Sequence, residues 1–85
     1  DRCEEAIEEY KKALNVAPKS FFAFQGLSVC YGLLGREDES KSAAEKMMEI
    51  NSNYTIKIFN KTTPYKDRDF VARLANVLRK AGVPE

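Results

Sequence analysis

The sequence contains no histidine and only two cysteines. Histidine is the most common general base and metal ligand near neutral pH, so its absence removes the usual centre of acid–base and metal chemistry. Cys3 and Cys30 lie far apart and form no Cys-x-x-Cys pair, so the spacing of a zinc site is also missing. We predict no metal and no cofactor, and we expect reduced cysteines in a cytoplasmic protein.

Strong charge and long apolar runs are missing as well. A formal net charge of +1 gives no field that favours nucleic acid or an acidic membrane. No stretch approaches the roughly 18 consecutive apolar residues that a membrane-spanning helix requires. The chain of 85 residues, with 44% hydrophobic and 32% charged residues, therefore predicts one folded domain with a modest core.

The residues that are present do not form a recognisable active site. Carboxylates such as Glu4, Glu8, Glu39 and Glu45 stand among lysines in segments with helical periodicity, where they are typical of a solvated surface. The glycines form no Gly-x-x-x-x-Gly-Lys phosphate loop. We therefore predict a protein that is not an enzyme.

Apolar residues recur at helical spacing from Glu4, and Pro18 ends this first segment. Ser20 is a good N-cap for a second helix, which Gly35 closes. This second helix is apolar nearly all round, so we expect it to be the most buried element. Acidic residues after Gly35 favour the start of a third helix, which runs to about Asn51.

The last third of the chain is less regular. The segment from Tyr54 to Phe59 fits either a short helix or an extended piece, and periodicity does not separate the two. The polar stretch 60–64 is predicted to break the pattern. Asp67 then caps a final helix that ends at Gly82, so we expect four substantial helices and no strand.

The chain also repeats itself. A shift of about 34 residues lays the first helix on the third, pairing Ala6 with Ser40, Tyr10 with Ala44, Ala13 with Met47, Val16 with Ile50 and Pro18 with Ser52. The second helix reads Phe-Gln-Gly-Leu-Ser-Val-Cys-Tyr over 24–31, with the turn Leu-Gly-Arg at 34–36. Together these features resemble the tetratricopeptide repeat, in which small and large residues alternate where two helices cross.

The resemblance implies an all-α fold built around an antiparallel helical hairpin. Its parts are the second helix of a truncated repeat at 1–19, one full repeat at 20–53, a connector at 54–66 and a capping helix at 67–82. The copy after Gly35 departs from the family pattern, because Ser40, Ala44 and Ser52 replace Ala, a bulky residue and Pro. Since the pattern begins in the middle of a repeat, we expect the chain to be a fragment of a larger protein.

The resemblance further implies a protein-interaction module. In this family the first helix of a repeat lines a concave groove that receives peptides, and the matching residues here are Phe22, Gln25, Val29 and Leu33. Gln25 and Val29 stand where a carboxylate clamp would need Lys and Asn, so an apolar peptide or helix is the better expectation. The alternative interpretation is that the capping helix or a neighbouring repeat covers this face.

Three other hypotheses remain open. The first-helix face of Cys3, Ile7, Tyr10 and Leu14 lacks the preceding helix of its repeat, so upstream sequence or a second copy in a homodimer is expected to cover it. The tail resembles, more weakly, repeat regions of bacterial class III adenylate or guanylate cyclases, which implies a regulatory or dimerisation segment. Basic residues interleaved with aromatics invite a less favoured nucleic-acid hypothesis; the residues concerned are Lys57, Lys61, Lys66, Arg68, Arg73, Arg79, Lys80, Tyr54, Phe59 and Tyr65.

Overall fold

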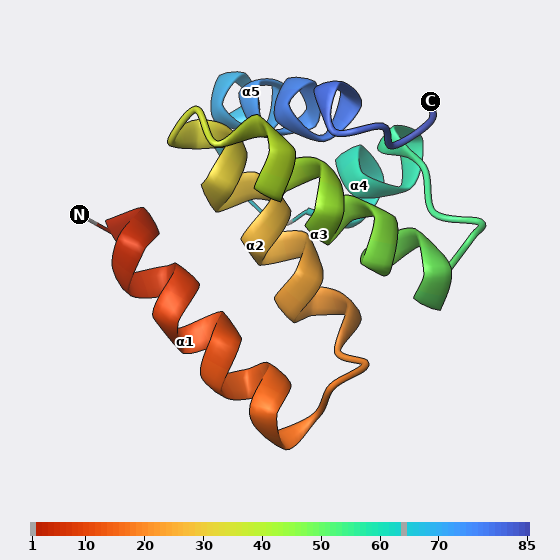
Figure 1. The fold of residues 1–85 in the computed structure, drawn as a ribbon. Helices are drawn as coiled ribbons and strands as arrows, with labels where there is room; N and C mark the ends of the chain where they lie inside the picture. The colour runs from red at the N-terminus through yellow and green to blue at the C-terminus, as the bar shows by residue number, and fades with distance from the viewer. Residues whose placement is uncertain (1, 64) are drawn as a thin grey trace.

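A computed structural model describes residues 2–63 and 65–85, and over these residues the chain is all-α (Figure 1). The described part contains five helices and no strand: α1 (Arg2–Val16), α2 (Phe21–Leu33), α3 (Glu37–Ile50), α4 (Ile56–Thr62) and α5 (Arg68–Lys80). The all-α prediction is therefore confirmed. Successive helices α1, α2 and α3 run in alternating directions, and α5 lies across one end of the α2–α3 pair (Figure 1).

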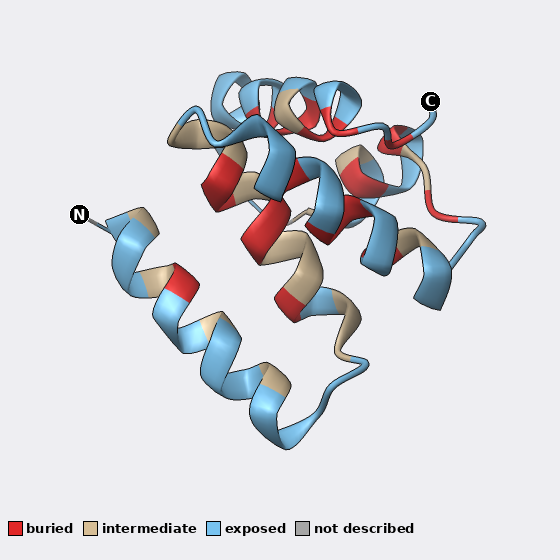
Figure 2. Ribbon diagram, viewed as in Figure 1, coloured by how far each residue is buried: buried red, intermediate tan, exposed pale blue. Residues whose placement is uncertain are grey.

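The second helix is the centre of the fold. α2 packs against α1, α3 and α5, while α4 packs against α5. Almost every residue of α2 is buried or half-buried, as expected from its apolar sequence, and Phe22 is the single exposed exception. In Figure 2 the buried residues follow α2 and the faces of α3 and α5 that are turned toward it.

Local signals set the ends of α2 as the sequence predicts. Ser20 is the N-cap, and its hydroxyl accepts a hydrogen bond from the Ala23 amide at 3.3 Å. At the other end Gly35 has a φ of +78°, a backbone conformation that residues with a side chain rarely adopt. The Arg36 amide then donates to the Tyr31 carbonyl at 2.8 Å, which closes the helix and turns the chain toward α3.

The segment after α3, which fitted either a short helix or an extended piece, contains helix α4, which begins at Ile56. Thr55 caps it, because its hydroxyl accepts from the Ile58 amide at 3.2 Å. The prediction that the regular pattern ends at residue 60 was wrong, since helix α4 continues to Thr62. The hydroxyl of Thr62 donates to the Ile58 carbonyl at 2.8 Å, so this polar residue stays inside the helical turn. Thr63 is extended, as expected before a proline, and Pro64 itself lies outside the described residues.

The C-terminal part closes on itself. Asp67 caps α5 by accepting from the Phe70 amide at 3.1 Å, and Gly82 ends it with a φ of +105°. The chain then returns toward α4, where the Ile56 amide donates to the Pro84 carbonyl at 2.8 Å. Val83 is only 4% exposed, so the tail is part of the core.

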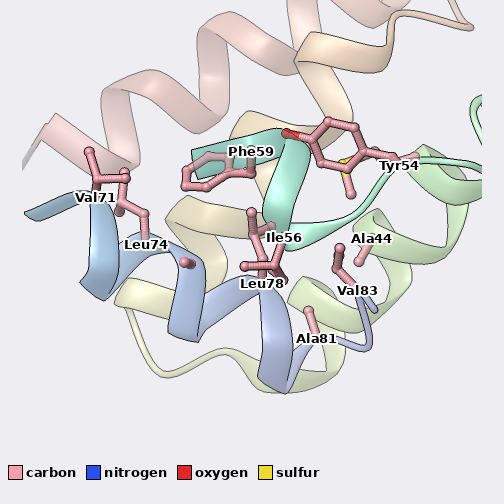
Figure 3. Packing of buried hydrophobic residues seen from close by; sticks show 11 residues of the cluster. Ala44, Tyr54, Ile56, Phe59, Val71, Leu74, Leu78, Ala81 and Val83 are labelled. Carbon is pink, nitrogen blue, oxygen red and sulfur yellow. The ribbon is translucent and has the colours of Figure 1, made fainter. Parts of the chain in front are cut away.

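Two clusters of buried side chains hold the helices together. The larger joins α3, α4, α5 and the tail, and Figure 3 shows Ile56 and Leu78 meeting between α4 and α5, with Val83 beside Ala44. The smaller joins α1, α2 and α3 around Ile7. Ile7 is 3% exposed, and Cys3, Tyr10 and Leu14 pack around the same cluster; they are half-buried.

The face of α1 that carries Cys3, Ile7, Tyr10 and Leu14 packs on α2. Only Ile7 is fully buried there, and the other three residues stay half-buried. Since α2 is apolar on several sides, it can contact α1, α3 and α5 at once. The expectation that upstream sequence or a second copy of the chain completes the cover of this face stays a prediction.

Candidate binding groove

A groove of about 820 Å³ runs between α1, α2, the segment 51–54, α4, the loop before α5, and α5 itself. Its lining is mainly apolar and aromatic. Of the five phenylalanines and four tyrosines of the chain, all but Phe24 and Tyr31 line it. Aromatic side chains combine a large contact area with few rotatable bonds, so a groove of this composition is suited to hold an apolar ligand.

Exposed apolar side chains also gather in this groove. In the part of the chain that the structure describes, every exposed large apolar residue except Val16 and Ile50 belongs to its lining. These residues come from four parts of the fold, namely Phe22 on α2, Ile58 on α4, Tyr65 on the loop and Phe70 on α5. Single exposed apolar residues are common, but a contiguous set is typical of an interaction surface.

All four predicted site residues line the groove: Phe22, Gln25, Val29 and Leu33. Their environments differ, and this difference bears on both interpretations made from the sequence. Val29 and Leu33 are half-buried and pack against the cluster of α4 and α5, so the C-terminal helices partly cover this face. Phe22 is 78% exposed, so the end of the stripe near the start of α2 stays open.

Gln25 is held by a residue that the sequence did not assign to the site. Its side chain is hydrogen-bonded to that of Tyr54, whose ring packs edge-on against Phe21 with centroids 4.8 Å apart. Burial raises the pKa of Tyr54, and the hydrogen bond with Gln25 opposes this effect in part. The phenol therefore stays neutral near pH 7.

Tyr10 and Cys3 of α1, together with Cys30 of α2, line the groove on the side of α1. The ring of Tyr10 lies directly over Gly26, so closely that a methyl group at Gly26 would overlap it. Burial raises the pKa of Tyr10, and neighbouring Cys30, Tyr65 and Cys3 raise it further. Burial, followed by the adjacent Cys3 thiol, raises the pKa of Cys30 to about 11. Both groups are therefore uncharged near neutral pH, so they add no ionic group to this wall.

The opposite edge of the groove depends on a loop that Arg68 anchors. Its guanidinium donates to the Asn60 carbonyl at 3.0 Å and to the Tyr65 carbonyl at 3.5 Å. The ring of Tyr65 packs edge-on against Phe70, with centroids 5.8 Å apart. This arrangement places two exposed rings along one edge, and neither residue was predicted as part of the site.

Among the described residues, Arg2 is the single charged side chain that lines the groove. A second hollow of about 640 Å³ lies between α3 and the end of α5 and has Lys41, Glu45 and Glu49 in its lining. The apolar groove thus differs in character from this second hollow, which supports its choice as the candidate site.

No family model matches the chain, and neither a curated protein nor a solved structure matches it. Over residues 2–63 and 65–85 no group of three or more histidine, cysteine or acidic side chains is arranged to hold a metal ion. Within the same residues, none of the helices has both the length and the apolar character needed to cross a membrane.

Proposed function

We propose that this chain is a protein-interaction module of the tetratricopeptide-repeat type, and that it acts within a larger protein by receiving an apolar segment of a partner in the groove. The observation that carries the proposal is the convergence of exposed Phe22, Ile58, Tyr65 and Phe70 on one groove of about 820 Å³. When a partner binds and removes such a surface from water, the free energy of the system falls.

Two contacts between helices support the repeat type. Tyr10 of α1 covers Gly26 of α2, and Ser28 of α2 is hydrogen-bonded to Ser40 of α3. Each contact places a small residue where two helices approach closely, which is the physical content of the repeat pattern. On this proposal the module binds and does not catalyse.

Affinity capture with paired variants tests the proposal. The double variant Phe22→Ala, Val29→Ala removes apolar area from the groove, and the matched control Val16→Ala, Ile50→Ala removes exposed apolar area outside it. We expect the groove variant to lose most of the main partner and the control to retain it, with the helical circular dichroism spectrum unchanged in both. Equal capture by wild type and both variants would place the interaction elsewhere.

A stability comparison keeps this test interpretable. Because Phe22 is 78% exposed, its change to alanine should alter the free energy of unfolding by less than about 1 kcal/mol. The same change at Phe59, which is 2% exposed, should cost roughly 3–5 kcal/mol. A loss of partner in a variant as stable as wild type is then a loss of binding.

The alternative role in a nucleotide cyclase stays a prediction.

A further inference from the structure

We infer that the partner segment is a short amphipathic helix whose apolar stripe is flanked by acidic residues. This inference rests on the proposed function and concerns the charge of what the groove receives. Its basis is the distribution of charged side chains around the groove, together with the length of the apolar stripe on α2.

The length of the stripe suits a helix of about three turns. Phe22, Val29 and Leu33 line the groove along α2, and the distance from the first to the last is roughly 16 Å at a rise of 1.5 Å per residue. A helical ligand that lies along this stripe can insert side chains spaced by three or four residues. Phe22 and Tyr65 are 78% and 53% exposed, so the groove is open along its edge and does not enclose a small ligand.

Basic residues lie beside the lining residues on α4 and α5, and exposed Asp69 is the acidic neighbour of Phe70. On α4 the lining residues Ile58, Phe59 and Thr62 share a face, and exposed Lys61, three residues after Ile58, lies at the Ile58 edge of that face. On α5 exposed Arg73 lies beside the lining residue Phe70, on the side away from buried Val71. Both cations therefore lie at the rim of the groove, where the polar side of a bound helix would be.

The opposite wall adds a cation within the groove. Arg2 lines the groove from α1. In the described residues none of Arg2, Lys61 and Arg73 takes part in an ion pair, whereas exposed Glu9 of α1 pairs with Lys12 at 3.6 Å. The cations that border the apolar surface are thus open to a partner, and acidic flanks on the ligand complement them.

Two designed peptides of 14 residues test this inference. Each carries the same apolar stripe and one tryptophan, and the flanking positions are all glutamate in one and all lysine in the other. Since the protein has no tryptophan, the indole fluorescence reports on the peptide alone. We expect the glutamate peptide to bind about ten times more tightly at low salt, and the preference to shrink as salt increases.

Charge reversal identifies the residues responsible. The variant Lys61→Glu, Arg73→Glu should weaken binding of the glutamate peptide about three- to tenfold and strengthen binding of the lysine peptide. The control Lys41→Glu, Lys46→Glu changes the net charge equally on α3, none of whose described residues line the groove. It should leave the preference unchanged.

The outcomes separate this inference from the proposed function. If both peptides bind equally well and the Phe22→Ala, Val29→Ala variant abolishes binding of both, the groove binds helices but the acidic partner is wrong. If neither peptide binds in a way that this variant abolishes, the proposed function fails as well. Displacement of the glutamate peptide by a single-stranded oligonucleotide, with a steep salt dependence, would overturn the inference in favour of a nucleic-acid ligand.

Discussion

Ser28 of α2 and Ser40 of α3 are joined by reciprocal hydrogen bonds in the interior of the protein. The Ser28 hydroxyl donates to the Ser40 carbonyl at 3.0 Å, and the Ser40 hydroxyl donates to the Ser28 carbonyl at 2.7 Å. The two side chains are 0% and 3% exposed, so neither hydroxyl has water as an alternative partner. Each serine thereby lets the helices approach closely while its polar group stays satisfied.

Removing either hydroxyl should therefore weaken the contact between α2 and α3. We expect Ser28→Ala and Ser40→Ala each to lower the free energy of unfolding by about 1 kcal/mol, measured by urea denaturation. Ser42→Ala on the exposed side of α3 is the control and should change stability by only a few tenths of a kcal/mol. Ser28→Val should cost more than Ser28→Ala, because two further carbon atoms do not fit between the helices. Stability unaffected by all of these changes would mean that the buried pair contributes nothing.

Gly32 provides a second close approach, between α2 and α5. A methyl group at this position would overlap the Cγ1 atom of Val77. Alanine favours a helix over glycine by about 1 kcal/mol, but Val77 is short and branched and cannot easily turn away. We expect Gly32→Ala to be destabilising by roughly 1–3 kcal/mol in thermal or urea unfolding.

The double variant Gly32→Ala, Val77→Ala tests the cause. Removing the valine methyl groups should make room for the new one, so the double variant should be more stable than the sum of the two single changes predicts. Gly26→Ala is a useful comparison, because the atoms it meets belong to the far end of the Tyr10 side chain, which can move into the groove. Strict additivity at Gly32 and Val77 would show that the two positions do not compete for space.

How far the sequence predicts this structure depends on whether a feature is local. The cap at Ser20 and the turn at Gly35 follow from the chemistry of a few neighbouring residues, and both are confirmed. Helix α4 could not be decided in advance, because seven residues give too few turns for periodicity. Its stability depends on α5 and on a hydrogen bond from Ile56 to Pro84, a partner far along the chain.

The groove was predicted along α2 alone, because the sequence shows only which residues within one helix share a face. Phe22, Val29 and Leu33 share a helix, so their spacing brings them together. Tyr65 and Phe70 reach the groove through the path of the loop before α5, which no periodic pattern encodes. The sequence did give a signal for Tyr65, which was among the interleaved aromatics of the basic C-terminal part, but none for Phe70. For that cluster the sequence favours a solvated face around a buried aromatic cap, and nucleic-acid binding is the less favoured hypothesis.

The raised pKa of Cys30 predicts a loss of stability at alkaline pH. The thiol has a pKa of about 11 in the folded protein, above its ordinary value of 9.0, because burial disfavours the thiolate. In the unfolded chain the thiol ionises first, so ionisation favours unfolding as the pH rises from about 9 to about 11. Stability should be full below pH 9 and should fall through this range, as measured by urea unfolding at a series of pH values.

Cys30→Ala provides the control for this pH dependence. The variant should be less stable than wild type at pH 7, because it removes a buried sulfur atom, but its stability should fall less steeply between pH 9 and 11. Tyr10 and Tyr54, whose pKa values are also raised by burial, contribute in the same direction and should leave a residual slope. Parallel pH profiles for wild type and variant would assign the alkaline loss to the tyrosines instead.

The C-terminal tail should contribute to stability far more than its length suggests. Val83 is 4% exposed and packs in the cluster that contains Ile56 and Leu78. Gly82 turns the chain into this position, and the Pro84 carbonyl accepts from the Ile56 amide at the start of α4. We expect Val83→Ala to cost about 1–2 kcal/mol in urea unfolding, and Val83→Asp to cost more because a buried carboxylate would have no partner. Glu85→Ala, which removes only the exposed pair with Arg79, should cost less than about 1 kcal/mol.

Hydrogen exchange should locate the effect, because loss of Val83 removes packing from α4 and α5 but not from α1. A uniform rise in exchange over all five helices would instead show that the tail stabilises the fold only as a single cooperative unit.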